Sequence, residues 1–468
     1  MNFSDLFFLY AFLPVCLILY FISPKIRYKN TILIIFSLLF YSSGNLLAAV
    51  FISGYSLLNF SLGRFIENTR GRKASKVLVT VGLFLNLGML LVFKYTGFFV
   101  ENLNSIFHLS LRTPSMWLPL GLSFFTFRTV SYLLDVYWEK IEAEKFFPDF
   151  LLFTSLFPCT VAGPIVRYST IGGELKDRTI NVDDMYQGLT RLCVGLAKKV
   201  LLADNLIAIV DAYWAAGNET VSTVETWYTV VVYSMYVYFD FSGYSDMAIG
   251  LGRIFGFHFE ENFNYPFMCR SVAEFWQRWH ISLGTFFKDY LLYVPIFGKM
   301  RRYGGLFLVW FCTGMWHGAS WNYIIWGLYF GLFIFIETLL GKKRLKKIPL
   351  AVKHIYTKLI IVIGFGIFRF TDIKQLGYFF RNLFFFSKGG FSGSMMSVYF
   401  VNNVFLFILA LICCFPLVPF VREKLSAKRP ALATAAGVVW GIICVALFVF
   451  SSIVLVNSTD RPFLYVQF

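Results

Sequence analysis

The stretch Cys312-Thr-Gly-Met-Trp-His-Gly-Ala-Ser-Trp321 places one histidine, His317, inside an apolar run that extends over residues 304–340. No charged residue occurs within eight positions of His317 on either side. The run is longer than the roughly 20 residues that cross a bilayer once, and Gly314 and Gly318 interrupt it. We therefore expect the run to bend or to re-enter the membrane.

His317 has two alternative interpretations. If its segment is helical, the two glycines form a face that admits another helix backbone, and Trp321 lies one turn beyond His317. A neutral imidazole in such a place can accept a proton from a hydroxyl group, as a catalytic base does. The alternative is a structural histidine that is hydrogen-bonded to a neighbouring helix.

The composition of the chain indicates a membrane protein. Of its 468 residues, 58% are hydrophobic and 15% are charged, whereas soluble domains carry about a quarter charged residues. A soluble globule cannot hide that much apolar surface, so the surplus must face lipid. The net charge of +16 comes from basic clusters at the ends of apolar runs, where they can meet lipid headgroups, so nucleic acid is not an expected partner.

The apolar runs predict an all-α, multi-pass membrane fold with about ten to twelve crossings. No long polar linker separates them, so we expect a single domain over 1–468, with its core at about 115–340. No basic residue precedes the first run, so we expect it to be a retained helix and not a cleaved signal peptide. The runs fall near 7–23, 31–42, 44–61, 77–94, 115–138, 149–166, 186–212, 225–250, 304–340, 355–370, 399–420 and 431–456.

Basic clusters between the runs predict the orientation, because cytoplasmic loops are enriched in Lys and Arg. The first two clusters are an even number of crossings apart, which places the N-terminus outside. The eight cysteines are scattered without metal-ligand spacing and are expected to be core residues. The clusters are Lys25, Arg27 and Lys29; Arg64, Arg70, Arg72, Lys73 and Lys76; Lys342, Lys343, Arg344, Lys346 and Lys347; and Arg422, Lys424, Lys428 and Arg429.

A second histidine lies in Glu274-Phe-Trp-Gln-Arg-Trp-His-Ile-Ser-Leu-Gly284. Glu274 and Arg278 are spaced to pair on one helical face, and Trp276, His280 and Gly284 would share another. An amphipathic helix at the membrane interface explains this pattern, with tryptophans at headgroup depth. It does not explain the choice of histidine.

Two further segments interrupt the apolar pattern. Tyr238–Asp246 (YFDFSGYSD) ends an apolar run with two carboxylates and several hydroxyls, which predicts either a hydrogen-bonded polar cluster or an ordinary helix end. Phe157–Pro164 (FPCTVAGP) contains two prolines and a glycine and should not form a straight helix. It lines a tunnel or is a plain kinked span.

Together these segments resemble the membrane-bound O-acyltransferase (MBOAT) superfamily, most closely its bacterial branch of alginate and peptidoglycan O-acetyltransferases, the AlgI/PatA-like branch. Several motifs occur in the family's order along most of the chain, which is more specific than any motif alone. They are PLGLSFFTF at 119–127, AGPIVRY at 162–168, FDFSGYSDMAIGLG and ENFNYP between Tyr238 and Pro266, EFWQRWH at 274–280, WHG at 316–318 and PFLYVQF at 462–468.

The resemblance implies a helical ring around a central tunnel, where a histidine meets a cytoplasmic thioester donor and an acceptor from outside. His317 falls on that histidine, and His280 falls on a second position that the superfamily fills with His or Asn. The remaining candidates would line or brace the tunnel; they are Asp240, Ser242, Tyr244, Asp246, Trp276, Arg278 and Trp316.

The same resemblance implies the partners. The donor is expected to be acetyl-CoA, used as a substrate without a bound cofactor or metal. The acetyl group is expected to pass outward across the bacterial inner membrane, often to a separate extracytoplasmic SGNH-like acetyltransferase. The family often has Gln at the position of Cys159 and Gln or His at the position of Arg128. These departures leave the identity of the donor and the tunnel lining open.

His317 would act as a general base on an acceptor hydroxyl or would carry the acyl group itself, and the sequence does not separate these mechanisms. His280 would orient a substrate or stabilise the oxyanion. A teichoic-acid D-alanyltransferase, which takes its acyl group from a carrier protein, is the alternative within the superfamily. A transporter is the alternative from another class, but the chain shows no inverted repeat. A structural scaffold would leave both histidines unexplained.

Overall fold

The computed structural model describes residues 1–114, 116–215, 217–292, 302–384, 387–393, 395–428, 430–457 and 461–464. These residues form two compact units. Unit 1 contains Met1–Leu192 and Tyr244–Glu261, and unit 2 contains Cys193–Gly243 and Asn262–Leu464. The single domain expected over the whole chain stays a prediction. Arg429 and the end of the C-terminal motif, 465–468, lie outside the described residues.

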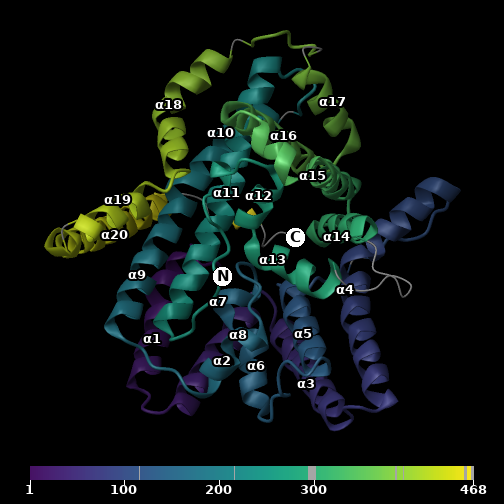
Figure 1. Ribbon diagram of the computed structural model, residues 1–468, viewed down its shortest axis with the longest axis vertical. Helices are drawn as coiled ribbons and strands as arrows, with labels where there is room; N and C mark the ends of the chain where they lie inside the picture. The colour runs from purple at the N-terminus through teal and green to yellow at the C-terminus, as the bar shows by residue number, and fades with distance from the viewer. Residues whose placement is uncertain are drawn as a thin grey trace. The chain divides into compact units, whose positions relative to one another are not determined.

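The described residues are almost entirely helical in their regular structure (Figure 1), with one isolated bridge between Phe263 and Trp279. The first half of the chain contains η1 Phe8–Phe12, α1 Leu13–Ile22, α2 Ile26–Ser42, α3 Leu46–Asn68, α4 Lys73–Phe107, α5 Leu122–Tyr137, α6 Phe147–Ser155, α7 Phe157–Thr160, α8 Tyr168–Lys176 and α9 Val182–Ala197. The second half contains η2 Lys198–Ala203, α10 Asp204–Trp214, α11 Thr223–Ile254, η3 Pro266–Met268, α12 Val272–Arg278, α13 Ile281–Phe287, η4 Lys288–Leu292, α14 Arg302–His317, α15 Trp321–Lys347, α16 Leu350–Arg369, α17 Ile373–Leu383, α18 Met395–Cys413, α19 Leu417–Lys428 and α20 Pro430–Asn457.

The structure confirms the all-α membrane class. Within the described residues, five helices are long and apolar enough to cross a bilayer, and two shorter apolar helices, Phe8–Ile22 and Val398–Cys413, accompany them. The ten to twelve crossings and the central tunnel stay predictions. The five candidate spans are Leu46–Asn68, Lys73–Phe107, Trp321–Lys347, Leu350–Arg369 and Thr434–Asn457.

Helix ends in unit 1 follow from proline and glycine positions. Helix α1 ends before Pro24, whose ring disfavours a helical conformation in the residue before it. Gly71, with a φ of 75°, allows the turn between α3 and α4. The break expected over Phe157–Pro164 is present, since α7 is a single short turn and Gly163 has a φ of 90°. That segment is therefore irregular, as its prolines predicted.

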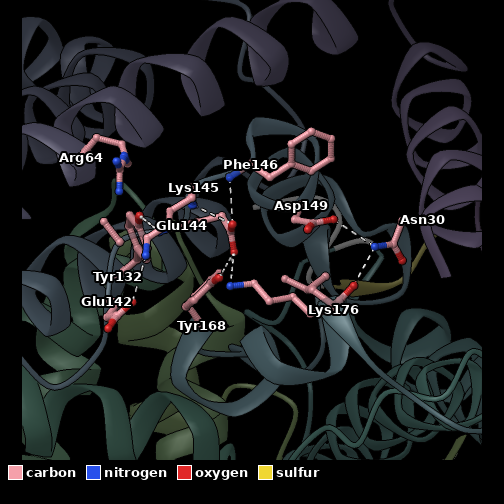
Figure 2. A network of polar contacts seen from close by, with 12 residues as sticks. Asn30, Arg64, Tyr132, Glu142, Glu144, Lys145, Phe146, Asp149, Tyr168 and Lys176 are labelled. Carbon is pink, nitrogen blue, oxygen red and sulfur yellow. Dashed lines mark hydrogen bonds and ion pairs between the residues drawn. The ribbon is translucent and has the colours of Figure 1, made fainter.

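A buried carboxylate ties together the loop between α5 and α6 in unit 1 (Figure 2). Glu144 accepts hydrogen bonds from the backbone N–H groups of Lys145 and Phe146, at 2.7 and 2.9 Å, and from the hydroxyl of Tyr168. Lys176 lies 3.2 Å from it and supplies the compensating charge. A buried carboxylate needs such partners, so this network holds the loop against α8.

A histidine outside the membrane-spanning helices links α8, α9 and the segment after α11. His258 Nδ1 lies 2.7 Å from Glu174, and its Nε2 lies 3.3 Å from Asp184. Partial burial by itself lowers the pKa of His258, but hydrogen bonds and charge from the two carboxylates outweigh it and raise the pKa above its ordinary value. When it is protonated, the imidazole bridges the two carboxylates.

Helices α14 and α15 of unit 2 pack closely as a hairpin, because glycines face each other where they cross. A Cβ added at Gly327 would collide with the carbonyl oxygen of Trp310, and one at Gly314 would collide with the carbonyl oxygen of Tyr323. The 304–340 run thus bends between His317 and Trp321, as expected. The expectation that one helix continues past His317 to Trp321 is wrong, because Trp321 begins a new helix.

We expect Gly327→Ala to destabilise the protein by about 1–3 kcal/mol, because the added methyl group forces the two helix backbones apart. The loss of stability is measured by thermal unfolding in detergent, which is monitored through the reaction of the buried cysteines with a thiol-reactive dye. Gly377→Ala in α17 is the matched control, since a Cβ there meets nothing within 4 Å. Equal melting temperatures for the two variants would contradict the close packing.

We expect His258→Gln to lower the melting temperature in a pH-dependent way. The folded-state pKa is raised, so the stabilisation is fully present below the ordinary value of about 6.5 and disappears as pH rises through the folded value. Melting curves at a series of pH values should therefore show wild type and variant converging as the pH rises. His108→Asn, a change of an exposed histidine, is the control. A constant difference at every pH would rule out the proton-linked bridge.

Candidate active site

His317 is the last residue of α14 and is buried, with 3% of its surface exposed. Gly318 follows it, and the chain turns before α15 begins. The imidazole packs edge-on against Trp326 of α15, at 4.7 Å between ring centroids, and against Phe368 of α16, at 5.1 Å. The end of a helix thus places this imidazole in an aromatic pocket formed by three helices.

His280 lies between two short helices, α12 and α13, in a left-handed conformation with φ 45° and ψ 54°. This conformation costs an ordinary residue about 1–2 kcal/mol, so surrounding contacts must impose it. The expectation of one amphipathic helix through Trp276, His280 and Gly284 is therefore wrong, because α12 ends at Arg278. Trp279 is buried and Trp276 is half-buried, and the placement of these tryptophans at headgroup depth stays a prediction.

Asn262 supplies the contacts around His280. Its side-chain oxygen lies 3.1 Å from His280 Nδ1 and accepts hydrogen bonds from the hydroxyl of Ser282 at 2.8 Å and from its backbone N–H at 3.3 Å. Its own carbonyl accepts from the N–H of Ile281 at 3.0 Å. Asn262 and Ser282 are both buried, so the turn at His280 is held by a closed set of hydrogen bonds.

Aromatic rings connect the two histidines. The ring of Trp316 lies 5.6 Å from that of His280 and 4.9 Å from that of His317, measured between centroids. Phe241 of α11 packs edge-on against His280 at 4.7 Å. Unit 2 therefore brings together both predicted catalytic residues and Trp316, which precedes His317 in the sequence.

A cavity of about 320 Å³ lies beside His280. It is bordered by α12 and α13 on one side and by α14 on the other, and most of its lining is apolar. Trp276 and Trp310 stand in its wall, with ring centroids 4.9 Å apart. The residues that line the cavity include His280, Thr313 and Lys288, so a substrate in it would meet an imidazole, a hydroxyl and an ammonium group.

Helix α12, which leads to His280, is anchored at its start by Glu337 of α15. The two carboxylate oxygens of Glu337 accept the N–H groups of Val272 and Ala273, at 2.7 and 2.9 Å. The side chain of Ser271 caps the same end by accepting the N–H of Glu274 at 3.0 Å. The hairpin of α14 and α15, in which α14 ends at His317, therefore also fixes the helix that leads to His280.

Asp240 is buried on α11 and pairs with Lys199, whose Nζ lies 2.9 Å from one of its carboxylate oxygens. Lys199 is equally buried and lies 2.9 Å from Asp204 as well. The second oxygen of Asp240 accepts the N–H of Leu464 at 2.9 Å. Asp240 is thus committed to an internal ion pair that also holds the chain near Leu464.

The other predicted site residues have separate surroundings. Arg278 pairs with Glu274, as expected, at 2.9 Å and borders a second cavity of about 370 Å³. Tyr244 and Asp246 belong to unit 1, where Tyr244 stacks on Phe3 and Asp246 pairs with Arg191. Their segment is interior to α11, so the helix-end interpretation is wrong, and their tunnel role stays a prediction.

Ser242 is buried on the same helix. The sequence interpretation did not identify Asn262, Glu337 or Lys199. Glu337 and Lys199 carried a usable signal, because each is an ionisable residue inside an apolar run and such residues need a partner. Asn262 lay within the ENFNYP motif, but nothing in its spacing pointed to His280. The part of the chain that the structure describes contains no group of three His, Cys, Asp or Glu side chains arranged to hold a metal ion.

The fold and this site define an integral membrane protein with two buried imidazoles in an aromatic setting, of which His280 lines a cavity of about 320 Å³ and His317 does not. Residues 145–371 match the model of the membrane-bound O-acyltransferase family. The chain belongs to this family and is a multi-pass membrane acyltransferase.

Curated relatives differ in the group and the acceptor that their names give. The chain is 37% identical to the probable alginate O-acetylase AlgI of Pseudomonas aeruginosa, over 92% of this chain and 85% of the relative. It is 35% identical to the peptidoglycan O-acetyltransferase of Helicobacter pylori, over 70% and 69%. It is 32% identical to the teichoic acid D-alanyltransferase of Bacillus subtilis, over 45% and 56%. The similarity is thus more extensive to the O-acetylating relatives.

We expect Lys199→Met to destabilise the protein by about 3–5 kcal/mol, because it leaves the buried Asp240 carboxylate without its cation, and Asp240→Leu to cost less, because Asp204 still lies 2.9 Å from Lys199. The double variant should lose much less than the sum, since it removes both charges. Melting temperatures of the four proteins in detergent complete the double-mutant cycle. Additive losses would show that the two groups do not depend on each other.

Proposed function

We propose that this protein transfers an acetyl group from a cytoplasmic thioester, acetyl-CoA, across the bacterial inner membrane for O-acetylation of an extracytoplasmic polysaccharide. The observation that carries the proposal is the place of His317, buried at the end of α14 and linked by Trp316 to His280. The names of the O-acetylating relatives support the acyl group and the class of acceptor.

In this proposal, His317 takes the proton from an acceptor hydroxyl as the oxygen attacks the thioester carbonyl. The carbon–sulfur bond then breaks, and the thiolate leaves with a proton returned by the imidazolium. Base catalysis of this kind contributes about 10²–10⁴ in rate. An acyl-histidine on His317 is the other route, in which the imidazole nitrogen attacks the thioester first and the hydroxyl then attacks the acyl-histidine.

His280 acts next to this reaction, either by orienting a substrate or by stabilising the oxyanion. Its ring lines the cavity of about 320 Å³, which is wide enough for the acyl end of a thioester. Trp276, Trp310 and the other apolar residues of the cavity keep it poor in water, which strengthens electrostatic contacts inside it. Asp240 braces this unit through Lys199 instead of touching a substrate.

The acetyl group is then received outside the membrane, by the polysaccharide or by a separate SGNH-like acetyltransferase that passes it on. The final polymer is alginate, peptidoglycan or a similar polysaccharide. The alternative is D-alanyl transfer from a carrier protein to teichoic acid, which the Bacillus subtilis relative supports over a shorter part of the chain.

We expect His317→Ala to lower the rate of acetyl transfer about 10²- to 10⁴-fold, because the base or the acyl carrier is lost. Membranes with the variant are supplied with labelled acetyl-CoA and an extracytoplasmic acceptor, and label in the acceptor is counted against the amount of folded protein. His108→Asn, which changes an exposed histidine at the end of α4, should keep the wild-type rate.

Wild-type transfer by His317→Ala would end the proposal. Label that enters the acceptor only from a D-alanyl thioester on a carrier protein would favour the D-alanyl alternative. Flux of a solute in proteoliposomes without covalent transfer of label would instead indicate a transporter.

A further inference from the structure

The hydrogen bonds around Asn262 identify which of its side-chain atoms faces His280. The backbone N–H of Ser282 points at this atom from 3.3 Å. A backbone N–H can only donate, so the atom that it meets must be the acceptor oxygen of the amide and not its NH₂ group. The same oxygen lies 3.1 Å from His280 Nδ1.

An oxygen acceptor at Nδ1 determines the proton position on a neutral imidazole. A carbonyl oxygen cannot donate, and the Ser282 hydroxyl, 3.5 Å from Nδ1, gives its one hydrogen to the same Asn262 oxygen at 2.8 Å, so Nδ1 must carry the hydrogen. The ring nitrogen with the lone pair is then Nε2. A neutral His280 in this tautomer accepts a hydrogen bond through Nε2 and cannot donate one from it.

The backbone on both sides of His280 keeps Asn262 in this position. Residues 262–264 run antiparallel to 278–282: Phe263 bridges to Trp279, and the N–H of Asn264 donates to the carbonyl of Arg278 at 2.9 Å. The N–H of Ile281 donates to the carbonyl of Asn262 itself. These backbone hydrogen bonds hold Asn262 beside the segment that contains His280. The contact between the Asn262 side chain and the imidazole is therefore supported by the backbone of both segments.

We propose that Asn262 is a positioning residue that fixes His280 as the Nδ1–H tautomer, so that His280 acts as a hydrogen-bond acceptor through Nε2. The inference rests on the proposed function for its place in acyl transfer. It selects between the two roles given above for His280. A neutral imidazole of this tautomer orients a hydroxyl-bearing substrate by accepting its proton in a hydrogen bond, whereas an oxyanion requires a donor.

The proton position can be measured without any substrate. The full-length protein is produced with ¹⁵N- and ¹³C-labelled histidine, purified in detergent, and its imidazole nitrogen shifts are recorded by NMR. The chain has five histidines, and His280→Ala identifies the signal of His280 by its loss. We expect the Nδ1–H pattern in the wild type and loss of that pattern in Asn262→Leu. An Nε2–H pattern in the wild type would overturn the proposal.

Kinetics then test the role in transfer. We expect Asn262→Leu to lower the rate about 10- to 100-fold, as when a partner that orients a functional histidine is removed. Asn262→Asp keeps the acceptor oxygen and adds a charge that favours the imidazolium. Because only neutral His280 can accept through Nε2, the acid limb of the pH–rate profile should move to higher pH by about 1–3 pH units.

The matched control is the same Asn262→Asp change in a His280→Ala background, where no shift of the acid limb is expected. A purely structural role for Asn262 would reduce folded protein in both backgrounds and leave the limb in place. A shift that persists without His280, or no shift with it, would overturn the positioning role. If the wild type transfers no acyl group, the proposed function fails, and the NMR result still decides the tautomer.

Discussion

A polar group in the interior of a membrane protein has no bulk water to bind, so it must find its partner within the protein. Much of unit 2 is arranged by this constraint. Glu337 meets the two leading N–H groups of α12, and Asn262 meets His280, Ser282 and the turn between them. Lys199 meets Asp240 and Asp204. The contacts of Glu337 with α12 and of Lys199 with Asp240 join segments that are far apart in the chain, so satisfying the polar groups also places the helices.

The two histidines illustrate two ways to hold an imidazole. His317 is placed by packing: α14 ends at it, glycines let α15 approach, and Trp326 and Phe368 enclose its ring. His280 is placed by hydrogen bonds, in a backbone conformation that would be unfavourable without them. A hydrogen bond to one nitrogen of a neutral imidazole determines which nitrogen stays basic, and Asn262 makes such a contact with His280.

Aromatic side chains make this arrangement compatible with a cavity. Trp276 and Trp310 are large and have few rotatable bonds, so they border the space beside His280 without filling it. Trp316 touches both imidazoles and keeps a defined spacing between them. Such rigid, mostly apolar surroundings hold the two imidazoles and the cavity wall in place.

Much of this architecture was readable from the sequence. The apolar runs predicted the helical membrane class, the glycines predicted the bend after His317, and the motif order indicated the family to which the chain belongs. Periodicity failed at His280, because a helical pattern continues through a residue whose backbone has turned left-handed. Nor did it indicate a partner for Asp240, a candidate for lining or bracing the tunnel, which the structure pairs with Lys199.

The sequence by itself determined that the protein spans a membrane and that it is helical, because composition and the apolar runs carry that information, and its resemblance to a family made His317 and His280 the candidates. Only the tertiary structure decided that Asn262 faces Nδ1 of His280, that Glu337 anchors α12 and that Trp316 connects the two rings. The reason is physical. Hydrogen bonds and ring contacts between distant segments depend on how helices pack, and no local pattern records which distant group will satisfy a buried donor.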